Sequence, residues 1–257
     1  MSMIFFLKDY FKKKNKSLYL LLRFIFLILN LKLHFKKITQ TKIVYKTLPK
    51  LFLFSKFGLI NNINSKKYWN NKHSNKLINP EETELSKNLY SILKKNLNFY
   101  KKDILDIGCG NGVFLNSIDV DCNLYGADLS NHILNNLKNK NITIYPLNLP
   151  DISLNKKFDI VTCFETLEHV SMWKKSIKNM IKLLKPNAHL CISVPFEDAI
   201  VIKEHVNYFD VQRLYTFIKK QKLYVAEIKI IGSWLLIVSI NRNHQPRTDK
   251  IISYFKC

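Results

Sequence analysis

The chain has 257 residues, of which 47% are hydrophobic and 23% are charged, and its formal net charge is +22. This length and apolar share are typical of a globular protein with one α/β domain and an appendage. The five cysteines are scattered, and none has C-x-x-C or Cys/His spacing, which excludes a zinc-type metal site and indicates free thiols in a reducing compartment.

The positive charge is concentrated in the first third of the chain. Residues 1–80 hold 17 Lys and Arg and one acid, Asp9. Residues 17–31 are almost entirely apolar, but Arg23 interrupts them and they are shorter than the roughly 20 residues that a spanning helix needs. We expect residues 1–60 to be a basic, apolar leader that either lies on an anionic membrane surface or packs as a lid on a catalytic domain. No recognised binding motif accompanies the charge, so we expect no nucleic-acid partner.

Residues 61–257 are expected to form the second domain. It begins with an Asn- and Lys-rich stretch that contains Tyr68 and Trp69. Pro80, which two acids follow, suits the first turn of a helix. Leucine and isoleucine then recur at helical spacing up to residue 97, so this helix is expected to pack against the sheet before its first strand.

Three of the six glycines of the chain lie close together after the next apolar stretch. Residues 103–107 predict a short, buried strand, and Gly108, Gly110 and Gly112 follow it. Only glycine lacks the Cβ that would keep a ligand away from the backbone. The helix expected from Val113 would present free N–H groups to an anion. Strand, glycine turn and helix together predict a nucleotide-cofactor site.

Strands and helices then alternate along the chain. Further strands are expected at Asn123–Asp128, Ile142–Leu147, Phe158–Glu165 and His189–Pro195, a helix at Trp173–Leu184, and a closing antiparallel hairpin at Tyr224–Ile231 and Trp234–Ile240. Asp128 ends the second strand, 20 residues after Gly108. A carboxylate at that place can accept hydrogen bonds from the hydroxyls of a ribose.

The spacing of the glycines separates two classes of cofactor site. A dinucleotide fingerprint reads G-x-G-x-x-G, whereas this chain reads G-x-G-x-G with Asp106 two residues before the first glycine. This pattern resembles motif I of the class I S-adenosylmethionine (SAM) methyltransferases. The stretch FDIVTCFETLEHV at 158–170 resembles their fourth-strand motif, in the subgroup that includes quinone-pathway O-methyltransferases and many glycan or natural-product methyltransferases. The resemblance covers roughly residues 66–240.

The resemblance implies a three-layer α/β/α, Rossmann-like fold with a seven-stranded, mostly parallel sheet and an antiparallel edge hairpin. It implies SAM as cofactor and a small-molecule acceptor as substrate. The cofactor-binding residues that it implies are Asp106, Gly108, Cys109, Gly110, Gly112, Asp128, Leu129, Asn148, Leu149 and Glu165. Asn148 stands where this family usually has an acid that contacts the adenine amine, and Asp151 is the nearby alternative.

Catalytic candidates follow the fourth strand, where an open α/β sheet binds ligands. They are Glu168 and His169, and a Glu-His-x-x-x-Phe segment that is similar in related methyltransferases adds His205. Imidazole can act as a general base near neutral pH. The alternative for each residue is a structural role in holding the loop. Methyl transfer needs no metal, so none is expected, although Glu165 beside Glu168 leaves one conceivable.

Three functions stay open from the sequence. The first is an O-methyltransferase that works at a membrane face on a hydroxyl of a prenylated phenol or a glycan. The second is an NAD-dependent oxidoreductase, which the glycine spacing and the edge hairpin disfavour. The third is a non-catalytic SAM-fold module that binds a partner or a membrane. We favour the first, and we expect a cytoplasmic protein that is peripheral on the membrane if its leader binds there.

Overall fold

The computed structural model describes residues 44, 48–58, 62–74, 80–137, 141–196, 202–241 and 253–255. The chain divides into two compact units, residues 1–60 and 61–257. Most of the first unit, including the apolar stretch 17–31 and the proposed membrane contact, lies outside the described residues.

Helix α5 (Pro49–Phe57) is the named element of the first unit. Pro49 stands in its first turn, where a missing N–H has no consequence for the hydrogen bonds of the helix. Gly58 ends it in the left-handed conformation, with φ 71°, and its N–H donates to the carbonyl oxygen of Phe54. Within the part of the chain that the structure describes, no helix has the length and apolarity to cross a bilayer.

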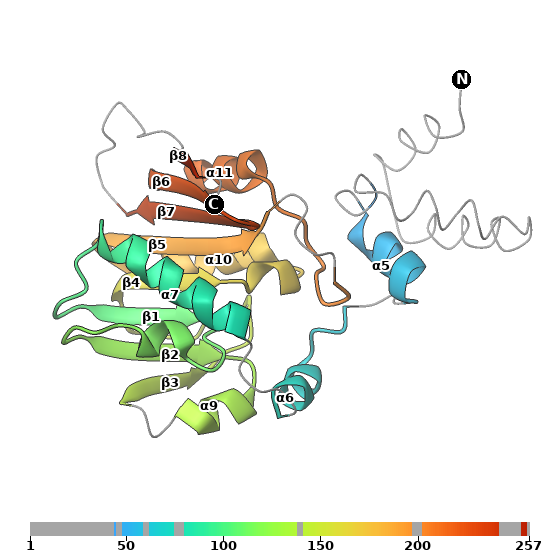
Figure 1. Cartoon of the computed structure of the whole chain (residues 1–257), viewed down its shortest axis with the longest axis horizontal. Helices are drawn as coiled ribbons and strands as arrows, with labels where there is room; N and C mark the ends of the chain where they lie inside the picture. The colour runs from blue at the N-terminus through green and yellow to red at the C-terminus, as the bar shows by residue number, and fades with distance from the viewer. Residues whose placement is uncertain are drawn as a thin grey trace, which may run out of the picture. The chain divides into compact units, whose positions relative to one another are not determined.

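A single sheet runs through the second unit in the order β3-β2-β1-β4-β5-β7-β6-β8 (Figure 1). Its strands are β1 (Asp103–Ile107), β2 (Asn123–Asp128), β3 (Ile142–Pro146), β4 (Phe158–Phe164), β5 (Leu184–Pro195), β6 (Tyr224–Ile231), β7 (Trp234–Ile240) and β8 (Ser253–Phe255). Strands β1 to β5 pair in parallel, and β7 pairs antiparallel with β5 and β6. The predicted fold is confirmed, and the short β8 extends its seven strands by pairing parallel with β6.

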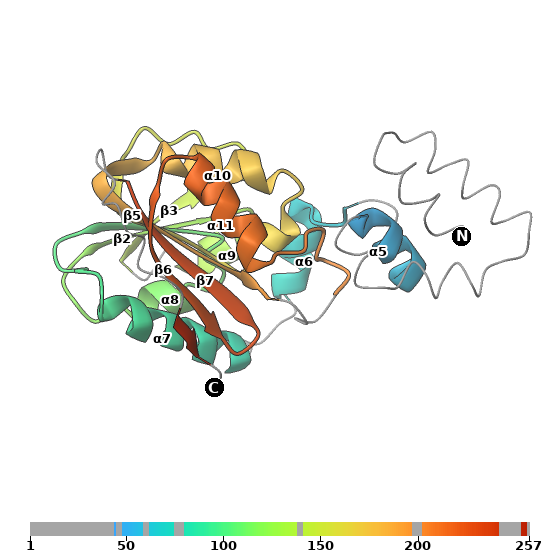
Figure 2. The same cartoon turned by 90° about the horizontal axis from the view of Figure 1, so that it is seen from above.

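Helices cover both faces of this sheet, and Figure 2 shows α10 and α11 on one face and α7 and α8 on the other. The helices of this unit are α6 (Lys66–Ser74), α7 (Pro80–Lys94), α8 (Val113–Asn116), α9 (Asn131–Leu137), α10 (Trp173–Ile181) and α11 (Val211–Lys220). The prediction that α10 reaches Leu184 is wrong, because the backbone of Leu184 already pairs with Phe158 of β4. At α11 the Asp210 side chain accepts a hydrogen bond from the N–H of Arg213, at 2.7 Å, as a helix cap.

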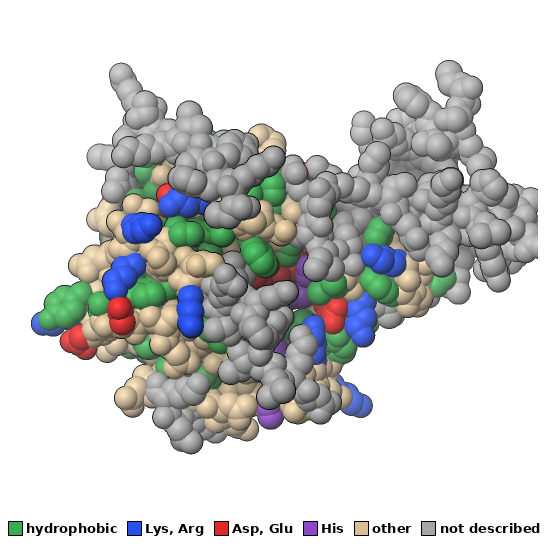
Figure 3. Space-filling view, in the orientation of Figure 1, with side chains coloured by type: hydrophobic (Ala, Val, Ile, Leu, Met, Phe, Trp, Pro, Cys, Tyr) green, Lys and Arg blue, Asp and Glu red, His purple; other side chains and the backbone are tan. Residues whose placement is uncertain are grey.

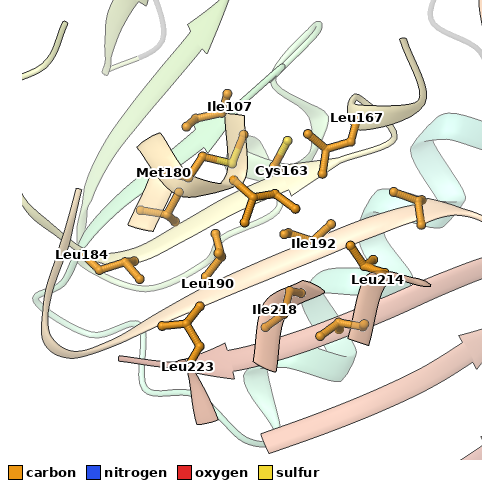
Figure 4. Close-up of a cluster of buried hydrophobic side chains, with 14 of the residues drawn as sticks. Ile107, Cys163, Leu167, Met180, Leu184, Leu190, Ile192, Leu214, Ile218 and Leu223 are labelled. Atoms are coloured by element: carbon orange, nitrogen blue, oxygen red, sulfur yellow. The ribbon is translucent and has the colours of Figure 1, made fainter. Parts of the chain in front are cut away.

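Two apolar clusters hold the layers together, one on each face of the sheet. On the first face, side chains of β1, β4 and β5 meet those of α10 and α11 (Figure 4). On the second face, residues of the same strands meet α7, α8 and α9. Leu105 and Ile107 belong to the first cluster and Ile104 to the second, as the alternation of a strand requires. Each of these three side chains is fully buried, which contributes about 1.5–3 kcal/mol per residue.

The charged side chains of the second unit lie mostly outside these clusters. On the face drawn in Figure 3, Lys and Arg side chains are scattered among hydrophobic and other polar ones. Four cysteines that the structure describes, Cys109, Cys122, Cys163 and Cys191, are free. Burial raises the pKa of the Cys109, Cys163 and Cys191 thiols, so all three are protonated at neutral pH and behave as small apolar side chains.

Candidate active site

The glycine turn leaves β1 in a tight bend that two hydrogen bonds fix. The N–H groups of Gly108 and Cys109 both donate to the carbonyl oxygen of Ala127, at 2.7 and 3.1 Å. At Gly108, with φ 77°, an added Cβ would lie 2.1 Å from the hydroxyl oxygen of Thr166. At Gly110, with φ 49°, an added Cβ would meet no heavy atom within 4 Å. The turn therefore packs closely at its first glycine and leaves open space beside its second.

Gly112 connects this turn to the helix layer. A Cβ there would lie 2.7 Å from the Cδ2 atom of Leu137, so the turn packs closely on α9 and a larger residue would require the Leu137 side chain to shift. The expected helix after the turn is present as α8, but it has only four residues. A single turn carries a small dipole, so the backbone N–H groups rather than the helix are the means of binding an anion here.

Two carboxylates flank the turn, a buried one at Asp106 and a half-buried one at Asp128. Asp106 is 3% exposed, and its Oδ1 accepts a hydrogen bond from the Thr162 hydroxyl at 2.7 Å. Burial raises the pKa of Asp106 to about 6, and the charge of Asp128 adds to this rise. The carboxylate of Asp128 accepts from the N–H groups of Gly110, at 3.1 Å, and Ser130, at 2.7 Å, while burial raises its pKa. A cation or a hydroxyl donor bound between the two acids would stabilise both carboxylates.

The remaining predicted cofactor residues near this end are more peripheral. Leu129 is half-buried directly after Asp128. Asn148 is exposed beyond the end of β3, and its backbone forms an isolated bridge with Asp151. Leu149 packs against the first apolar cluster. The structure thus brings Asp106, Asp128 and the glycine turn together. The contact that it describes for Asn148 is with Asp151.

Glu165 directly follows the central strand β4 and has a strained backbone. Its φ of 46° lies in the left-handed region, which costs a non-glycine residue roughly 1–3 kcal/mol. Its Oε1 accepts a hydrogen bond from the Ser193 hydroxyl at 2.9 Å, and the indole N–H of Trp234 also donates to it. Burial raises the pKa of Glu165 to about 8, so this carboxyl is largely protonated at pH 7.

Glu168 lies in the short 3-10 helix η1 (Leu167–His169) and is 2% exposed. Its Oε2 atom has no hydrogen-bond partner among the described residues. Burial, with the charge of Glu165 adding to it, raises the pKa of Glu168 well above its usual value. Buried polar atoms are nearly always paired, so this oxygen indicates a place for a proton, a water molecule or a ligand.

Two histidines complete this cluster. The rings of His169 and His205 meet edge to face with their centroids 5.0 Å apart, and their nitrogens and a Glu168 oxygen all lie within 4.8 Å of one another. Burial lowers the pKa of His169 to about 4 and that of His205 to about 3. Both imidazoles are therefore uncharged at neutral pH and carry a lone pair. Such a set can accept a proton from a substrate or ligate a divalent cation.

Helix α6 contacts this cluster from one side. The Tyr68 hydroxyl donates to Oε1 of Glu204 at 2.5 Å, and the Lys72 ammonium lies 2.9 Å from the same oxygen. The ring of Trp69 stands edge to face on His169, with centroids 4.9 Å apart. The Tyr68–Trp69 pair thus lies beside the histidine cluster.

The same helix contacts the loop beside Asp128 through the side-chain amide of Asn70. Oδ1 of Asn70 accepts a hydrogen bond from the Ser130 hydroxyl, at 2.9 Å, and Ser130 follows Asp128 by two residues. Sequence reasoning missed Asn70, because nothing separates it from the other asparagines around it. It also missed Glu204, for which the only signal was its place beside the candidate His205.

A sequence profile described as a methyltransferase domain matches residues 81–227, which is more than half of the chain. The chain belongs to this methyltransferase family. The match includes the glycine turn, both acids beside it and the cluster of Glu168, His169 and His205, whereas helix α6 lies before it. The NAD-dependent alternative is set aside by this match.

Relatives and solved structures agree with this membership. An uncharacterized protein of Methanocaldococcus jannaschii is 32% identical over 170 residues, which are 64% of this chain and 73% of that protein. A ubiquinone biosynthesis O-methyltransferase of Rickettsia akari is 24% identical over 188 residues, which are 63% and 73% of the two chains. The crystal structure of N-methyltransferase NodS from Bradyrhizobium japonicum WM9, in complex with S-adenosyl-L-homocysteine, has a TM-score of 0.53 at 20% identity and covers 64% of this chain and 89% of that one.

The residues of this methyltransferase fit its cofactor, SAM. The family match and the fold together confirm the predicted enzyme class and cofactor. SAM carries a cationic ammonium and sulfonium, and the site offers the carboxyls of Asp106, Asp128 and Glu165. The open space beside Gly110 admits a ligand against bare backbone.

Proposed function

We propose that this methyltransferase methylates an oxygen of a small-molecule acceptor, a hydroxyl of a prenylated phenol or of a glycan. The observation that supports this proposal is the cluster of Glu168, His169 and His205, which brings together two uncharged imidazoles, one from the segment after β4 and one from the loop after β5. The name of the Rickettsia akari relative, a ubiquinone biosynthesis O-methyltransferase, agrees with a phenolic acceptor.

SAM supplies the electrophilic methyl group, and the residues of the chain bind and orient both reactants. In this proposal Asp106 binds the ammonium of the cofactor, Asp128 accepts from its ribose hydroxyls, and the glycine turn contacts its carboxylate. Holding two reactants in line removes much of the entropic part of the barrier. The sites of the two substrates then meet at Glu165, between the glycine turn and the histidine cluster.

His169 takes the proton of the acceptor hydroxyl at its Nε2 atom. Because burial lowers the pKa of His169 to about 4, this imidazole is a weak base in the free protein. The transfer becomes favourable as the acceptor oxygen turns into an ether and its proton becomes acidic. The Oε1 atom of Glu168 lies 3.6 Å from Nε2, and because burial favours the protonated form of Glu168, it can stabilise the imidazolium as a dipole rather than as a full charge.

The side chains around this nitrogen favour a phenol over a glycan. Trp69 stands edge to face on His169, and His205 meets the same ring from another side. Aromatic rings pack well against one another in such arrangements, at about 0.5–1.5 kcal/mol per pair. A sugar hydroxyl is also far less acidic than a phenol, so it would need a stronger base than this one.

The experiment is an assay of the purified chain with isotope-labelled SAM and a set of phenols and catechols, with and without prenyl chains, beside glycans. Mass spectrometry then identifies the methylated atom. We expect transfer to a phenolic oxygen, and none with Asp128→Ala. Binding of S-adenosylhomocysteine without transfer to any acceptor would favour the non-catalytic module. Dialysis against a chelator before the assay distinguishes a general-base role of the histidines from a metal-ligand role. Activity that is lost on dialysis and returns only with added Mg²⁺ would mean that the cluster binds a metal.

A further inference from the structure

We propose that Glu204 is a positioning residue that fixes His169 in its Nδ1–H tautomer and leaves Nε2 as the acceptor nitrogen. The inference rests on the proposed function only in the use of Nε2 as a base, because the tautomer itself can be observed without any substrate. Glu204 lies in the loop between β5 and α11, 35 residues after His169.

The first step concerns the ring nitrogens of His169. Nδ1 lies 3.2 Å from the backbone carbonyl oxygen of Glu204. A carbonyl oxygen can only accept a hydrogen bond, so Nδ1 must carry the proton. A neutral imidazole has one N–H, which leaves the lone pair on Nε2, 3.6 Å from the Oε1 atom of Glu168. Free histidine prefers the opposite tautomer, so the surroundings determine the form in this site.

The second step concerns what holds that carbonyl oxygen in place. The side-chain amide of Asn64 donates to it at 2.7 Å. The carboxylate of the same residue, Glu204, takes hydrogen bonds from the Tyr68 hydroxyl and the Lys72 ammonium of α6. Although burial acts to raise its pKa, these two donors lower the pKa of Glu204 to about 2, and the carboxylate stays charged in neutral solution. The position of Glu204 therefore depends on both its backbone and its side chain.

The third step shows that the same loop segment also fixes the helix that carries His169. The N–H groups of Val206 and Asn207 donate to the carbonyl oxygen of Glu168, at 2.8 and 3.1 Å. The side-chain amide of Asn207 donates to the carbonyl oxygens of Leu167 and Val170, at 2.9 and 2.7 Å. With η1 held in this way, the ring of His169 keeps its direction, and the contact with Glu204 decides which of its nitrogens carries the proton.

The experiment uses the full chain labelled with ¹⁵N-histidine, at neutral pH and without acceptor. Nitrogen-detected NMR distinguishes a protonated ring nitrogen from one with a lone pair, and His169→Asn assigns the signal. The variants are Glu204→Ala, Glu204→Gln and the matched control Glu227→Ala. Glu227 likewise binds a lysine, Lys229, at 2.6 Å, but it lies on β6. Steady-state kinetics with the best acceptor gives kcat and the KM for SAM.

We expect the Nδ1–H form of His169 in the wild type and in the control. Glu204→Ala should show the Nε2–H form or a mixture, with kcat lowered about tenfold or more and the KM for SAM within about twofold. Glu204→Gln should restore both readouts, because its amide oxygen can still accept from Tyr68 and Lys72. If Glu204→Ala fails to fold, Tyr68→Phe and Lys72→Met each remove one of these donors and should shift the tautomer in the same direction.

Two results would overturn the inference. One is the Nε2–H form in the wild type, and the other is an unchanged tautomer and unchanged kcat in the folded Glu204→Ala protein. A wild type that transfers no methyl group to any acceptor removes the proposed function instead. The tautomer of His169 is then still decided by the spectra, so the two failures remain distinguishable.

Discussion

Oδ1 of Asn70 lies 2.9 Å from the hydroxyl oxygen of Ser130, which ties helix α6 to the loop beside Asp128. Two residues earlier on the same helix, Tyr68 binds Glu204 in the loop after β5. Helix α6 therefore contacts both the loop beside Asp128 and the loop that carries Glu204. These contacts come from a segment that lies before the matched methyltransferase domain at residues 81–227.

The first prediction concerns the pH dependence of SAM binding. Burial raises the pKa of Asp106 to about 6, so this acid is protonated in the free protein at pH 5. The ammonium of SAM favours the carboxylate, so binding should release a proton below pH 6. We expect the affinity to rise with pH, by at most about tenfold per unit for one proton, and to level off above pH 6. Calorimetry between pH 5 and 8, in two buffers of different ionisation enthalpy, measures both the affinity for SAM and the number of protons released on binding.

Two variants test the source of this proton. Asp106→Asn should bind SAM more weakly and with an affinity that no longer changes near pH 6. If Glu165, with its pKa of about 8, also contacts the cation, a second rise should follow near that pH and disappear in Glu165→Gln. A wild-type affinity that is flat from pH 5 to 7 would contradict the assignment of Asp106 to the ammonium.

The second prediction compares two glycines of the same turn. In Gly108→Ala the new Cβ would lie 2.1 Å from the Thr166 hydroxyl oxygen, so the protein should lose several kcal/mol of stability or fail to fold. In Gly110→Ala the new Cβ meets nothing, and only the positive φ opposes it, which costs about 1–2 kcal/mol. Thermal unfolding and SAM titration should therefore show Gly110→Ala folded but impaired in cofactor binding.

Gly232→Ala is a matched control for this comparison. It has a positive φ of 56° in the β6–β7 turn, and its added Cβ would meet only Trp234, no closer than 3.5 Å. Its stability should fall by about as much as that of Gly110→Ala, while its affinity for SAM should stay unchanged. Equal SAM affinity in the wild type, Gly110→Ala and Gly232→Ala would mean that the cofactor does not lie against Gly110.

Most of the fold could be predicted from local patterns in the sequence. The second strand ends at Asp128 as expected, and the fourth ends at Phe164, one residue before the expected Glu165, because the run of buried residues and the following turn are adjacent in the chain. The boundary between α10 and β5 was placed wrongly, since Leu184 suits the apolar face of a helix and the choice depends on its pairing with Phe158. That pairing is a tertiary contact, which periodicity does not contain.

The residues of the site could be predicted from the sequence only where they lie in a short motif. Asp106 and the glycines stand in one short stretch, and Glu168 and His169 stand in another. The bonds from Asn70 to Ser130 and from Tyr68 to Glu204 join residues 60 and 136 positions apart. Asn70 lies in a stretch rich in asparagine, where no local pattern distinguishes one amide from the next. The structure was needed to show which side chains of α6 contact Glu204 and His169.

The third prediction concerns an ion-pair network at the opposite end of the sheet from the site. The carboxylate of Asp103 lies 2.8 Å from the Lys185 ammonium and 3.3 Å from that of Lys156. Burial acts to raise the pKa of Asp103, but hydrogen bonds from these lysines outweigh it and bring the pKa to about 2. Asp103→Asn should lower the free energy of unfolding at pH 7 by about 1 kcal/mol, after allowance for the partly exposed lysines.

The sign of the pH effect follows from the lowered pKa. The ionised Asp103 stabilises the fold above the unfolded pKa of about 4, and this contribution is lost as the pH falls toward 2. Denaturant titrations of the wild type and of Asp103→Asn should therefore differ at pH 7 and converge only as the pH falls through about 2. Asp119→Asn is the control, because Asp119 is an exposed carboxylate that also pairs with a lysine, Lys94, and accepts a hydrogen bond from the Tyr90 hydroxyl. A difference that persists at low pH would mean that the mutation acts through packing.

The fourth prediction separates the two histidines. Nε2 of His169 faces the Glu168 carboxyl, whereas His205 contacts His169 through its ring. If His169 is the base, His169→Asn should lower kcat by about 10²–10⁴-fold and leave SAM affinity unchanged, since removal of a general base acts on the chemical step. His205→Asn should lower kcat less, because it removes only a neighbour of that ring. The measurement is kcat in single substitutions, beside calorimetric SAM affinity for each. Full activity in both variants would remove the general-base role, and a larger loss in His205→Asn would transfer that role to His205.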